Sequence, residues 1–221
     1  MAVSDRRPLV TVAYAQSLDG CIAARPGTRT PLSGPESLAY THRLRAAHDA
    51  VLVGIGTVLA DDPRLTVRLA SGNHPQPIVL DSRLRLPLSA ALLRHPTHRP
   101  WLATTHAAAG DAALVEPLQA LGAELFPLAS DAAGRIDLSA LLAALGGRGI
   151  RTLMVEGGAG VLTAFLAGGH ADRISVTVAP RWLGGLPALT RPLALQLHDP
   201  VWRDLGDDRV LEARLSDREA A

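Results

Sequence analysis

Short apolar runs alternate with segments of helical spacing along most of this chain, and no other feature constrains the fold as strongly. The runs expected to form buried strands are residues 9–16, 50–54, 77–80, 101–104, 124–127, 151–156 and 173–179. Helical spacing occurs at residues 111–121, 137–145 and 160–166. Strands that alternate with helices in this way predict an α/β domain with a mostly parallel central sheet flanked by helices.

Two more segments complete the predicted architecture. Residues 33–36 (SGPE) have the pattern of a capping box with proline in the first turn, which predicts a helix that runs to about residue 48. Residues 209–215 alternate well enough to predict an antiparallel strand at the C-terminal edge of the sheet. The sequence has no internal repeat and no linker, so we expect one domain over residues 1–221, with its core at about 8–216.

The composition argues against several classes of function. Lys and Arg total 22 against 21 acidic residues, so the chain has no large basic field that would hold nucleic acid. Cys21 is the only cysteine, which excludes a disulfide within the chain and a cysteine-based metal cluster, and we expect no metal. The sequence has no signal-peptide pattern and no stretch of ~20 apolar residues. We therefore expect a cytoplasmic protein without a membrane partner.

Three segments place small, polar or charged residues at the ends of predicted strands, where open α/β sheets bind their ligands. The first is residues 17–20 (SLDG), in which Asp19 stands beside a glycine directly after a predicted strand. A carboxylate in this place either faces a ligand or belongs to an ordinary polar turn. The segment alone leaves both alternatives open.

The second segment is residues 54–68 (GIGTVLADDPRLTVR), which also follows a predicted strand. Gly54 and Gly56 would let the backbone approach a ligand closely. Asp61 and Asp62 form a pair of carboxylates that can orient hydroxyl groups or handle protons. Either aspartate can equally be a cap of a turn or a helix.

The third segment is residues 155–160 (VEGGAG), where a strand runs into glycines that open a helix. The positive end of a helix suits a pyrophosphate, but the segment lacks the third glycine of the full dinucleotide fingerprint. Glu156 is more informative, because a carboxylate that closes an apolar run is costly unless something uses it. Held at one sheet edge, the three segments predict a pocket for a nucleotide or a sugar phosphate.

Five segments of the chain resemble the pyrimidine reductases of riboflavin biosynthesis. They are SLDG (17–20), GIGTVLADDPRLTVR (54–68), IVLDSRLRLP (78–87), VEGGAGVLTAFL (155–166) and VAPRWLGG (178–185). This family includes the reductase half of the bacterial deaminase–reductase and the standalone archaeal and fungal enzymes. The resemblance covers nearly the whole chain in the family's order and spacing, and TVLADDPRLTVR is a highly specific run.

The resemblance implies a dihydrofolate-reductase-like three-layer sandwich with an antiparallel C-terminal edge, working as a homodimer. The implied reaction reduces the ribosyl group of a 5-amino-6-(5-phosphoribosylamino)pyrimidine to the ribitylamino product. NADPH is the implied cofactor, with NADH as the alternative, and it delivers a hydride to C1′. The pyrimidine is either the uracil or the 2-amino-pyrimidinone form, and the second is the form that the standalone archaeal enzymes use.

The resemblance also implies roles for individual residues. Cofactor contacts are implied for Ala15, Thr57, Asp61, Ser82, Gly158, Ala159, Gly160, Val161, Leu162, Thr163 and Ala164. Substrate contacts are implied for Arg45, Leu65, Arg68 and Glu156, and the two arginines suit a 5′-phosphate. The implied catalytic residues are Asp19, Asp61 and Glu156.

Arg83 is a further candidate for a cofactor contact, and Arg45 has an alternative to its implied role. Arg83, directly after Ser82, would suit a 2′-phosphate and favour NADPH over NADH. Arg45 has the alternative of an ordinary solvated arginine on a helix surface, because its helix also carries Arg43.

The chain departs from the bacterial bifunctional enzymes at two places. Those enzymes carry a lysine in the first strand where this chain has Ala13, and a Ser-x-Trp segment where it has Arg29-Thr30-Pro31. The zinc-deaminase motif of those enzymes is also missing from this sequence.

Two other functions compete with the riboflavin-pathway reductase. One is a dihydrofolate-reductase-like reductase of another pterin or pyrimidine, which the presence of Arg45 and Arg68 disfavours. The other is a non-catalytic nucleotide-binding sensor, which would have little reason to keep Asp19, Asp61 and Glu156.

Overall fold

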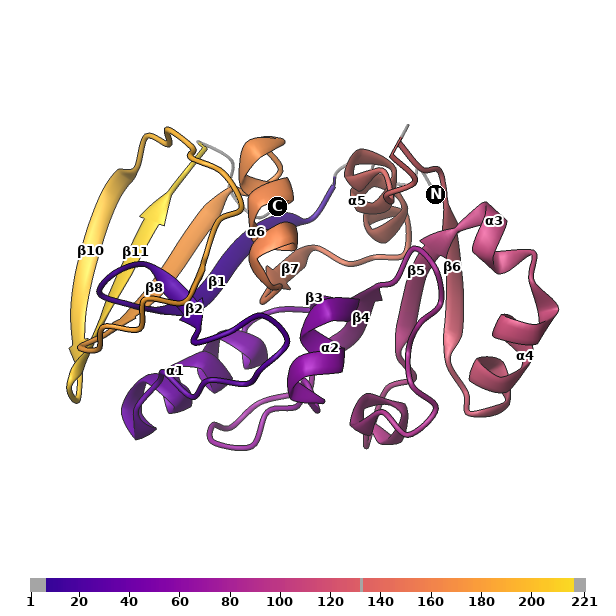
Figure 1. Ribbon diagram of the computed structural model, residues 1–221, viewed down its shortest axis with the longest axis horizontal. Helices are drawn as coiled ribbons and strands as arrows, with labels where there is room; N and C mark the ends of the chain where they lie inside the picture. Colours follow the sequence, from indigo (N-terminus) through magenta and orange to yellow (C-terminus); the bar gives the residue numbers. More distant parts are fainter. Residues whose placement is uncertain (1–6, 132, 217–221) are drawn as a thin grey trace.

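The computed structural model describes residues 7–131 and 133–216 and is built around a nine-stranded sheet (Figure 1). The strands lie in the order β10-β11-β8-β1-β7-β3-β4-β5-β6. Their bounds are β1 Leu9–Ser17, β3 Ala50–Gly54, β4 Gln76–Leu80, β5 Trp101–Thr105, β6 Glu124–Leu128, β7 Thr152–Val155, β8 Arg173–Ala179, β10 His198–Leu205 and β11 Asp208–Arg214. The pairs from β8 to β6 are parallel, whereas β11 and β10 extend the sheet in antiparallel fashion.

The predicted α/β fold with a mostly parallel sheet is confirmed, and the seven apolar runs form its parallel strands. Residues 209–215 correspond to the antiparallel strand β11, and the predicted antiparallel C-terminal edge of the sheet is confirmed, although β11 is not its outermost strand. β10 pairs with the outer side of β11 and is itself the edge. Six of the eight residues of β10 are exposed, so its sequence carries no burial pattern by which it could be located.

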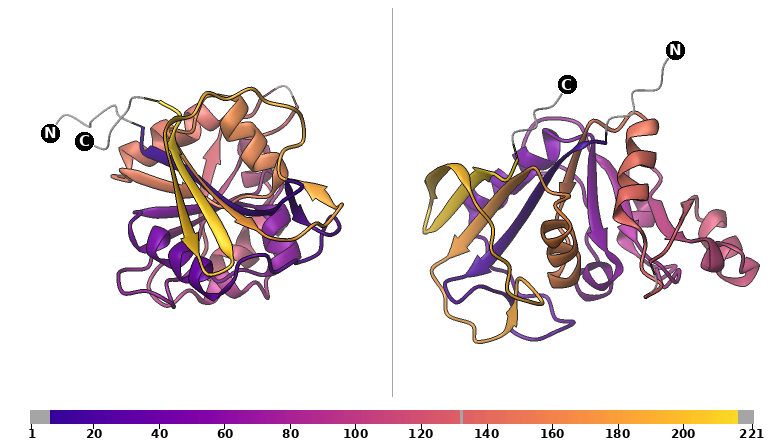
Figure 2. Two further views of the ribbon diagram at one scale, coloured as in Figure 1. Left: turned by 90° about the vertical axis from the view of Figure 1, so that its left-hand side faces the viewer. Right: turned by 90° about the horizontal axis from the view of Figure 1, so that it is seen from above.

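Helices cover both faces of the sheet and complete three layers (Figures 1 and 2). Their bounds are α1 Pro35–Ala46, α2 Ile55–Asp61, α3 His106–Ala109, α4 Ala112–Ala120, α5 Leu138–Gly147, α6 Ala159–Ala167 and the 3₁₀ helix η1 Ala91–Arg94. α5 and α6 pack on one face, whereas α1, α2, η1 and α4 pack on the other. A small separate sheet joins β2 (Cys21–Ala23) to β9 (Leu186–Pro187).

The core is aliphatic on both faces of the parallel strands. Leu142 of α5 and Phe165 of α6 belong to one buried cluster with Val12 of β1. On the opposite face, Val58 of α2 belongs to a second cluster with Val51 of β3. Strands buried on both faces have near-continuous apolar sequences, which is why the apolar runs located them correctly.

The first turn of α1 differs from the predicted capping box. Gly34 is the N-cap and provides no side-chain hydrogen bond, so the prediction for residues 33–36 is wrong, although Pro35 stands in the first turn as expected. Asp208 of β11 supplies the missing acceptor. Its Oδ2 accepts hydrogen bonds from the N–H of Gly34, at 2.7 Å, and from the hydroxyl of Ser37. α1 is thereby fixed to the antiparallel part of the sheet.

Replacing this remote cap tests its role in stability. Asp208→Ala is expected to lower the free energy of unfolding by about 1–3 kcal/mol, because the Gly34 N–H and the buried Ser37 hydroxyl lose their acceptor. Urea unfolding followed by circular dichroism measures the change. Asp207→Ala alters an exposed residue of the same turn and should stay within about 0.5 kcal/mol of the parent protein. Equal losses in the two variants would contradict the capping role.

Candidate active site

A cavity of about 1480 Å³ lies at the carboxyl ends of β1, β3, β4 and β7. Parts of α1, α2, α6 and the 26–33 loop also line it. Two of the three segments singled out in the sequence meet there, since Thr57 and Asp61 come from one and Glu156 and Gly158 from the other. The cavity is therefore placed where parallel α/β sheets bind ligands.

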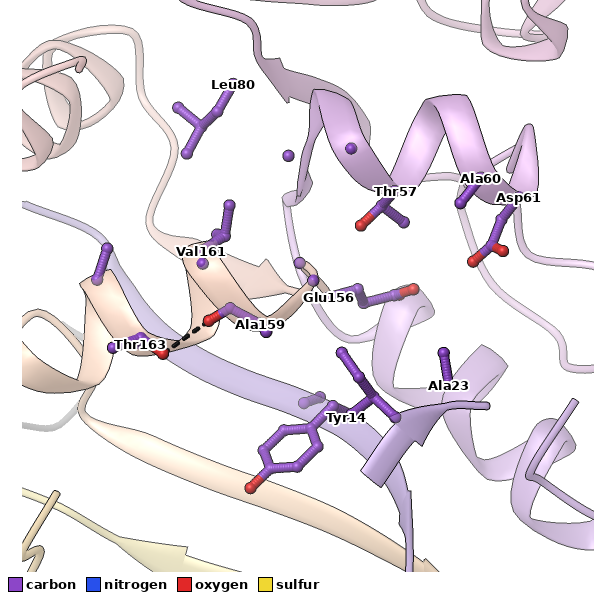
Figure 3. Close-up of a pocket in the computed structure, with 18 of the residues that line it drawn as sticks. Tyr14, Ala23, Thr57, Ala60, Asp61, Leu80, Glu156, Ala159, Val161 and Thr163 are labelled. Carbon is purple, nitrogen blue, oxygen red and sulfur yellow. Dashed lines mark hydrogen bonds between the residues drawn. The ribbon is translucent and has the colours of Figure 1, made fainter. Parts of the chain in front are cut away.

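The N-terminal turn of α6 forms one wall of this cavity (Figure 3). A Cβ atom built at Gly54 or Gly157 would lie 2.7 Å or 2.5 Å from the side chain of Val161, so these two glycines allow α6 to pack close to β3. A Cβ atom at Gly158 would lie 3.3 Å from Oγ1 of Thr57. The first N–H groups of a helix have no acceptor within the helix. The glycine-lined corner between Thr57 and α6 therefore fits a phosphate-bearing ligand.

α2 forms a second wall, with Thr57 and Asp61 directed toward the cavity (Figure 3). Partial burial raises the pKa of the Asp61 carboxyl, although the positive charge of Arg29 opposes the shift. A carboxyl group with a raised pKa exchanges its proton closer to neutral pH than an ordinary aspartate does. α2 has only seven residues and is followed by Asp62 in the left-handed conformation, so its sequence was too short to predict a helix.

Glu156 and Arg45 form a two-point ion pair at the edge of the cavity. Nε and Nη2 of Arg45 donate to Oε1 and Oε2 of Glu156, both at 2.6 Å, and Nη1 donates to the carbonyl of Thr66 at 3.2 Å. The side chains are only 12% and 14% exposed. Burial opposes the charge of Arg45, but the Glu156 carboxylate outweighs it and raises the pKa of the guanidinium. The alternative of a solvated surface arginine is therefore wrong for Arg45.

Arg68 lies beside this ion pair. Its backbone N–H donates to Nδ1 of His42 at 2.9 Å, and its Nη1 donates to Oγ1 of Thr66 at 2.6 Å. Burial, together with the charges of Arg45 and Arg68, lowers the pKa of His42 to about 4, so this imidazole is neutral at pH 7. Burial and the charge of Arg45 also lower the pKa of Arg68. Two positively charged guanidinium groups that repel each other would both be stabilised by an anion bound between them.

The structure brings most of the predicted ligand contacts together. The predicted residues that line the cavity are Ala15, Thr57, Asp61, Ser82, Glu156, Gly158, Ala159, Gly160, Val161, Thr163 and Ala164. Arg45 and Arg68 lie outside its lining, and both donate hydrogen bonds to Thr66. Leu162 is fully buried in the core, and Leu65 is 1% exposed with a positive φ of 53°. Side-chain contact between a ligand and these two leucines has no support in the geometry.

Asp19 stands apart from the cavity and holds a loop. Its carboxylate accepts hydrogen bonds from the backbone N–H groups of Leu183, at 3.0 Å, and Gly184, at 2.6 Å, and from the Ser17 hydroxyl at 2.5 Å. These bonds, that of Ser17 above all, hold the pKa of Asp19 well below its usual range. The carboxylate therefore joins the end of β1 to the segment that follows β8, and it is not among the residues that line the cavity.

Several hydroxyl-bearing residues of the cavity wall were not among the predicted contacts, and four of them are Tyr14, Tyr40, Ser175 and Thr177. Three of them stand inside strands that were identified only by their apolar character. Ser175 and Thr177 alternate with apolar residues along β8 and are almost fully buried. Buried hydroxyls in a strand need hydrogen-bond partners, and this is the signal that could have drawn attention to them.

The departures from the bifunctional enzymes also lie at the cavity, because Ala13 and residues 29–31 line it. Arg83, in contrast, is exposed and outside the lining, although the neighbouring Ser82 belongs to it.

Within residues 7–131 and 133–216, no group of three or more His, Cys, Asp or Glu side chains is placed to hold a metal ion. Cys21 is buried as a free thiol. In the same part of the chain, no helix is long and apolar enough to cross a membrane.

Comparison with known proteins identifies relatives over almost the full length. Residues 8–211 match the model of the RibD C-terminal domain family. The 2,5-diamino-6-ribosylamino-4(3H)-pyrimidinone 5′-phosphate reductase of Archaeoglobus fulgidus is 39% identical over 189 residues, which cover 81% of this chain and 83% of that protein.

Solved structures agree with this match. Acinetobacter baumannii RibD superposes with a TM-score of 0.82 at 26% identity, over 96% of this chain but only 59% of the RibD chain. The riboflavin biosynthesis reductase of Saccharomyces gives a TM-score of 0.74 at 30% identity, over 95% of this chain and 90% of that one. Enterococcus faecalis dihydrofolate reductase, at 10% identity and a TM-score of 0.54, shares the fold alone. The dihydrofolate-reductase-like fold is thus confirmed.

The hydrogen bonds of Asp19 predict a structural role that can be measured. Asp19→Asn is expected to speed amide hydrogen exchange at Leu183 and Gly184 by about tenfold, because a neutral side chain binds two N–H groups more weakly than a carboxylate. Exchange followed by mass spectrometry or NMR gives the rates. Asp111→Asn, at the N-cap of α4, is the matched control and should leave that loop unchanged. Unaltered exchange in the Asp19 variant would remove the anchoring role.

Proposed function

The chain belongs to the RibD C-terminal domain family, and from this premise we propose that it is a reductase of riboflavin biosynthesis. It reduces the ribosyl group of a 5-amino-6-(5-phosphoribosylamino)pyrimidine to a ribityl chain. In the overall reaction C1′ gains a hydride, its bond to the ring oxygen breaks, and that oxygen gains a proton. We propose that the chain acts as one reductase domain.

One observation carries this proposal. Glu156 directly precedes the two glycines that open α6, so a carboxylate paired with an arginine lies next to a corner that fits a phosphate (Figure 3). A dinucleotide at the start of α6 and a sugar phosphate beside Glu156 and Arg45 would have adjacent reacting ends. Bringing two reactants together in this way supplies a large part of the rate enhancement of an enzyme.

The glycine-lined corner fits the dinucleotide that such a reductase requires. Thr57, Ser82 and the backbone of Gly158 to Ala164 hold it, with the α6 N-terminus at its phosphates. When bound, the nicotinamide cofactor supplies the hydride. NADPH is the proposed form, because the family resemblance implies it, and NADH is the alternative.

The substrate lies on the other side of Glu156. Arg45 orients the Glu156 carboxylate by its two-point hydrogen bond, and Arg68 adds positive charge for the 5′-phosphate. Asp61 is the proposed proton-handling group, since its carboxyl lines the cavity and its pKa is raised by burial. Asp19 acts as a positioning residue, through the loop that it anchors.

Two expectations from the sequence remain proposals. The protein works as a homodimer, and it resides in the cytoplasm. A reductase of another pterin or pyrimidine and a non-catalytic sensor are the remaining alternatives, and no particular contact in the cavity favours either of them.

A direct assay tests the proposed function. Purified protein is mixed with NADPH or NADH and with the uracil or the 2-amino-pyrimidinone form of the substrate, and loss of absorbance at the nicotinamide band is followed. We expect turnover with at least one pyrimidine form, and faster turnover with NADPH. Absence of turnover in all four combinations would refute the proposal.

Glu156 is expected to matter to the substrate more than to the cofactor. Glu156→Gln keeps the shape of the side chain but removes the charge that Arg45 holds in place. We expect kcat/KM for the pyrimidine to fall by about 100-fold or more, whereas the Kd for NADPH changes by less than about threefold. Steady-state kinetics and a fluorescence titration with NADPH give the two values. Equal losses in both would contradict this division of the site.

Arg68 is expected to contribute to phosphate binding. Arg68→Ala should raise KM for the phosphorylated substrate by about 10- to 100-fold, which corresponds to the loss of a charge-assisted hydrogen bond. Arg94→Ala removes an exposed arginine of η1, outside the cavity lining, and controls for the change in net charge. An unchanged KM in the Arg68 variant would show that the phosphate binds elsewhere.

A further inference from the structure

Four residues form one row across the sheet on the face covered by α1. Glu212 of β11 pairs with Ser175 of β8, and Ser175 pairs with Ala13 of β1. Val12 pairs with Val155, so Glu156 continues the row on the other side of Ala13. Paired residues of neighbouring strands project from the same face of a sheet. The small Ala13 therefore separates the Glu156 carboxylate from the Ser175 hydroxyl by roughly two strand spacings, about 10 Å.

α1 closes this row from above through Tyr40. The Tyr40 hydroxyl donates to Oε1 of Glu212 at 2.6 Å and lies 3.1 Å from Oγ of Ser175. Nε of Arg203, from β10, donates to the other carboxylate oxygen of Glu212 at 2.7 Å. Tyr40 and Ser175 both line the cavity, whereas Glu212 and Arg203 lie behind them.

The donor and the acceptor can be assigned for each hydrogen bond in the series from Arg203 through Glu212 and Tyr40 to Ser175. An ionised carboxylate only accepts hydrogen bonds, and Arg203 only donates them, so the Tyr40 proton must point to Glu212. Burial raises the pKa of Tyr40, and its hydroxyl keeps that proton at neutral pH. The Tyr40 oxygen can then only accept from Ser175, which commits the single Ser175 proton to Tyr40.

As a consequence, the Ser175 hydroxyl at the cavity wall can only accept a hydrogen bond from a ligand. Ser175 is 4% exposed, so a ligand in the cavity, rather than bulk solvent, would donate a hydrogen bond to its oxygen. With its proton committed, Ser175 offers only lone pairs to the cavity. A buried acceptor prefers a ligand N–H or O–H and disfavours a carbonyl oxygen, which would leave two acceptors facing each other.

We propose that Ser175 determines substrate specificity by accepting a hydrogen bond from the 2-amino substituent of the pyrimidine ring, with Tyr40, Glu212 and Arg203 holding the Ser175 proton away from the ring. The ring lies over Ala13, between Ser175 and Glu156. This inference rests on the proposed function. It selects the 2-amino-pyrimidinone form over the uracil form, because the two forms differ by an amino group in place of a carbonyl oxygen.

The sharpest test reverses the donor–acceptor direction of the hydrogen bonds that link Ser175, Tyr40 and Glu212. In Glu212→Gln, Arg203 can only donate, so the amide oxygen faces Arg203 and the amide N–H₂ faces Tyr40. Tyr40 must then donate to Ser175, and Ser175 must donate to the cavity. We expect the ratio of kcat/KM for the amino form to that for the uracil form to fall by about tenfold, although residue 212 lies outside the cavity lining.

Two further variants separate this effect from general damage. Ser175→Ala removes the acceptor and should reduce the same ratio severalfold, while the Kd for NADPH stays unchanged. Asp204→Asn breaks the exposed ion pair with Arg209 in the same hairpin and should leave the ratio as in the parent protein. Thermal unfolding of each variant records any loss of stability, which a purely structural role would produce without a change in the ratio.

The outcomes are distinct. A lower ratio in Glu212→Gln and Ser175→Ala, but not in Asp204→Asn, supports the proposal. A ratio unchanged in Glu212→Gln and Ser175→Ala, in a protein that turns over either form, overturns the proposal and leaves the proposed function intact. No turnover by the parent protein with either form overturns both.

Discussion

The ion pair between Glu156 and Arg45 is the interaction on which the site depends. It joins the end of β7 to α1 across 111 residues of sequence, with two hydrogen bonds of 2.6 Å and little exposure of either side chain. Two charges withdrawn from water cost free energy that a pair of apolar residues would not, so such a pair is poor evidence of stability alone. Its position beside the glycines that open α6 supports instead the proposed role in orienting ligands.

The rest of the fold places this pair. Val161 packs so closely against Gly54 and Gly157 that α6 is held at the end of β3, and Asp208 of β11 holds the first turn of α1. α1 then spans the sheet face and provides Arg45 to Glu156 at one place and Tyr40 to Ser175 at another. A single helix thus positions both Glu156 and Ser175 at the cavity.

The sequence predicted the parallel strands because a strand buried on both faces is apolar throughout, and it predicted the glycine-opened turn after β7 because few residues tolerate that approach. It could not predict β10, whose residues are mostly exposed, or the short helix α2. Nor could it show that Arg45 is paired rather than solvated, because the partner is distant in sequence. The cap of α1 and the loop-binding role of Asp19 could not be predicted for the same reason. Their partners, Asp208 and Leu183, are also distant in sequence.

The central claim is that one cavity holds a nicotinamide against C1′ of a phosphoribosylamino-pyrimidine, and isotope transfer tests it most directly. NADPH deuterated at C4 on one face or the other is supplied with the unlabelled pyrimidine, and the ribityl product is analysed by mass spectrometry. The account predicts one deuterium at C1′ from one of the two labelled cofactors and none from the other. A product that carries no deuterium from either cofactor would contradict it.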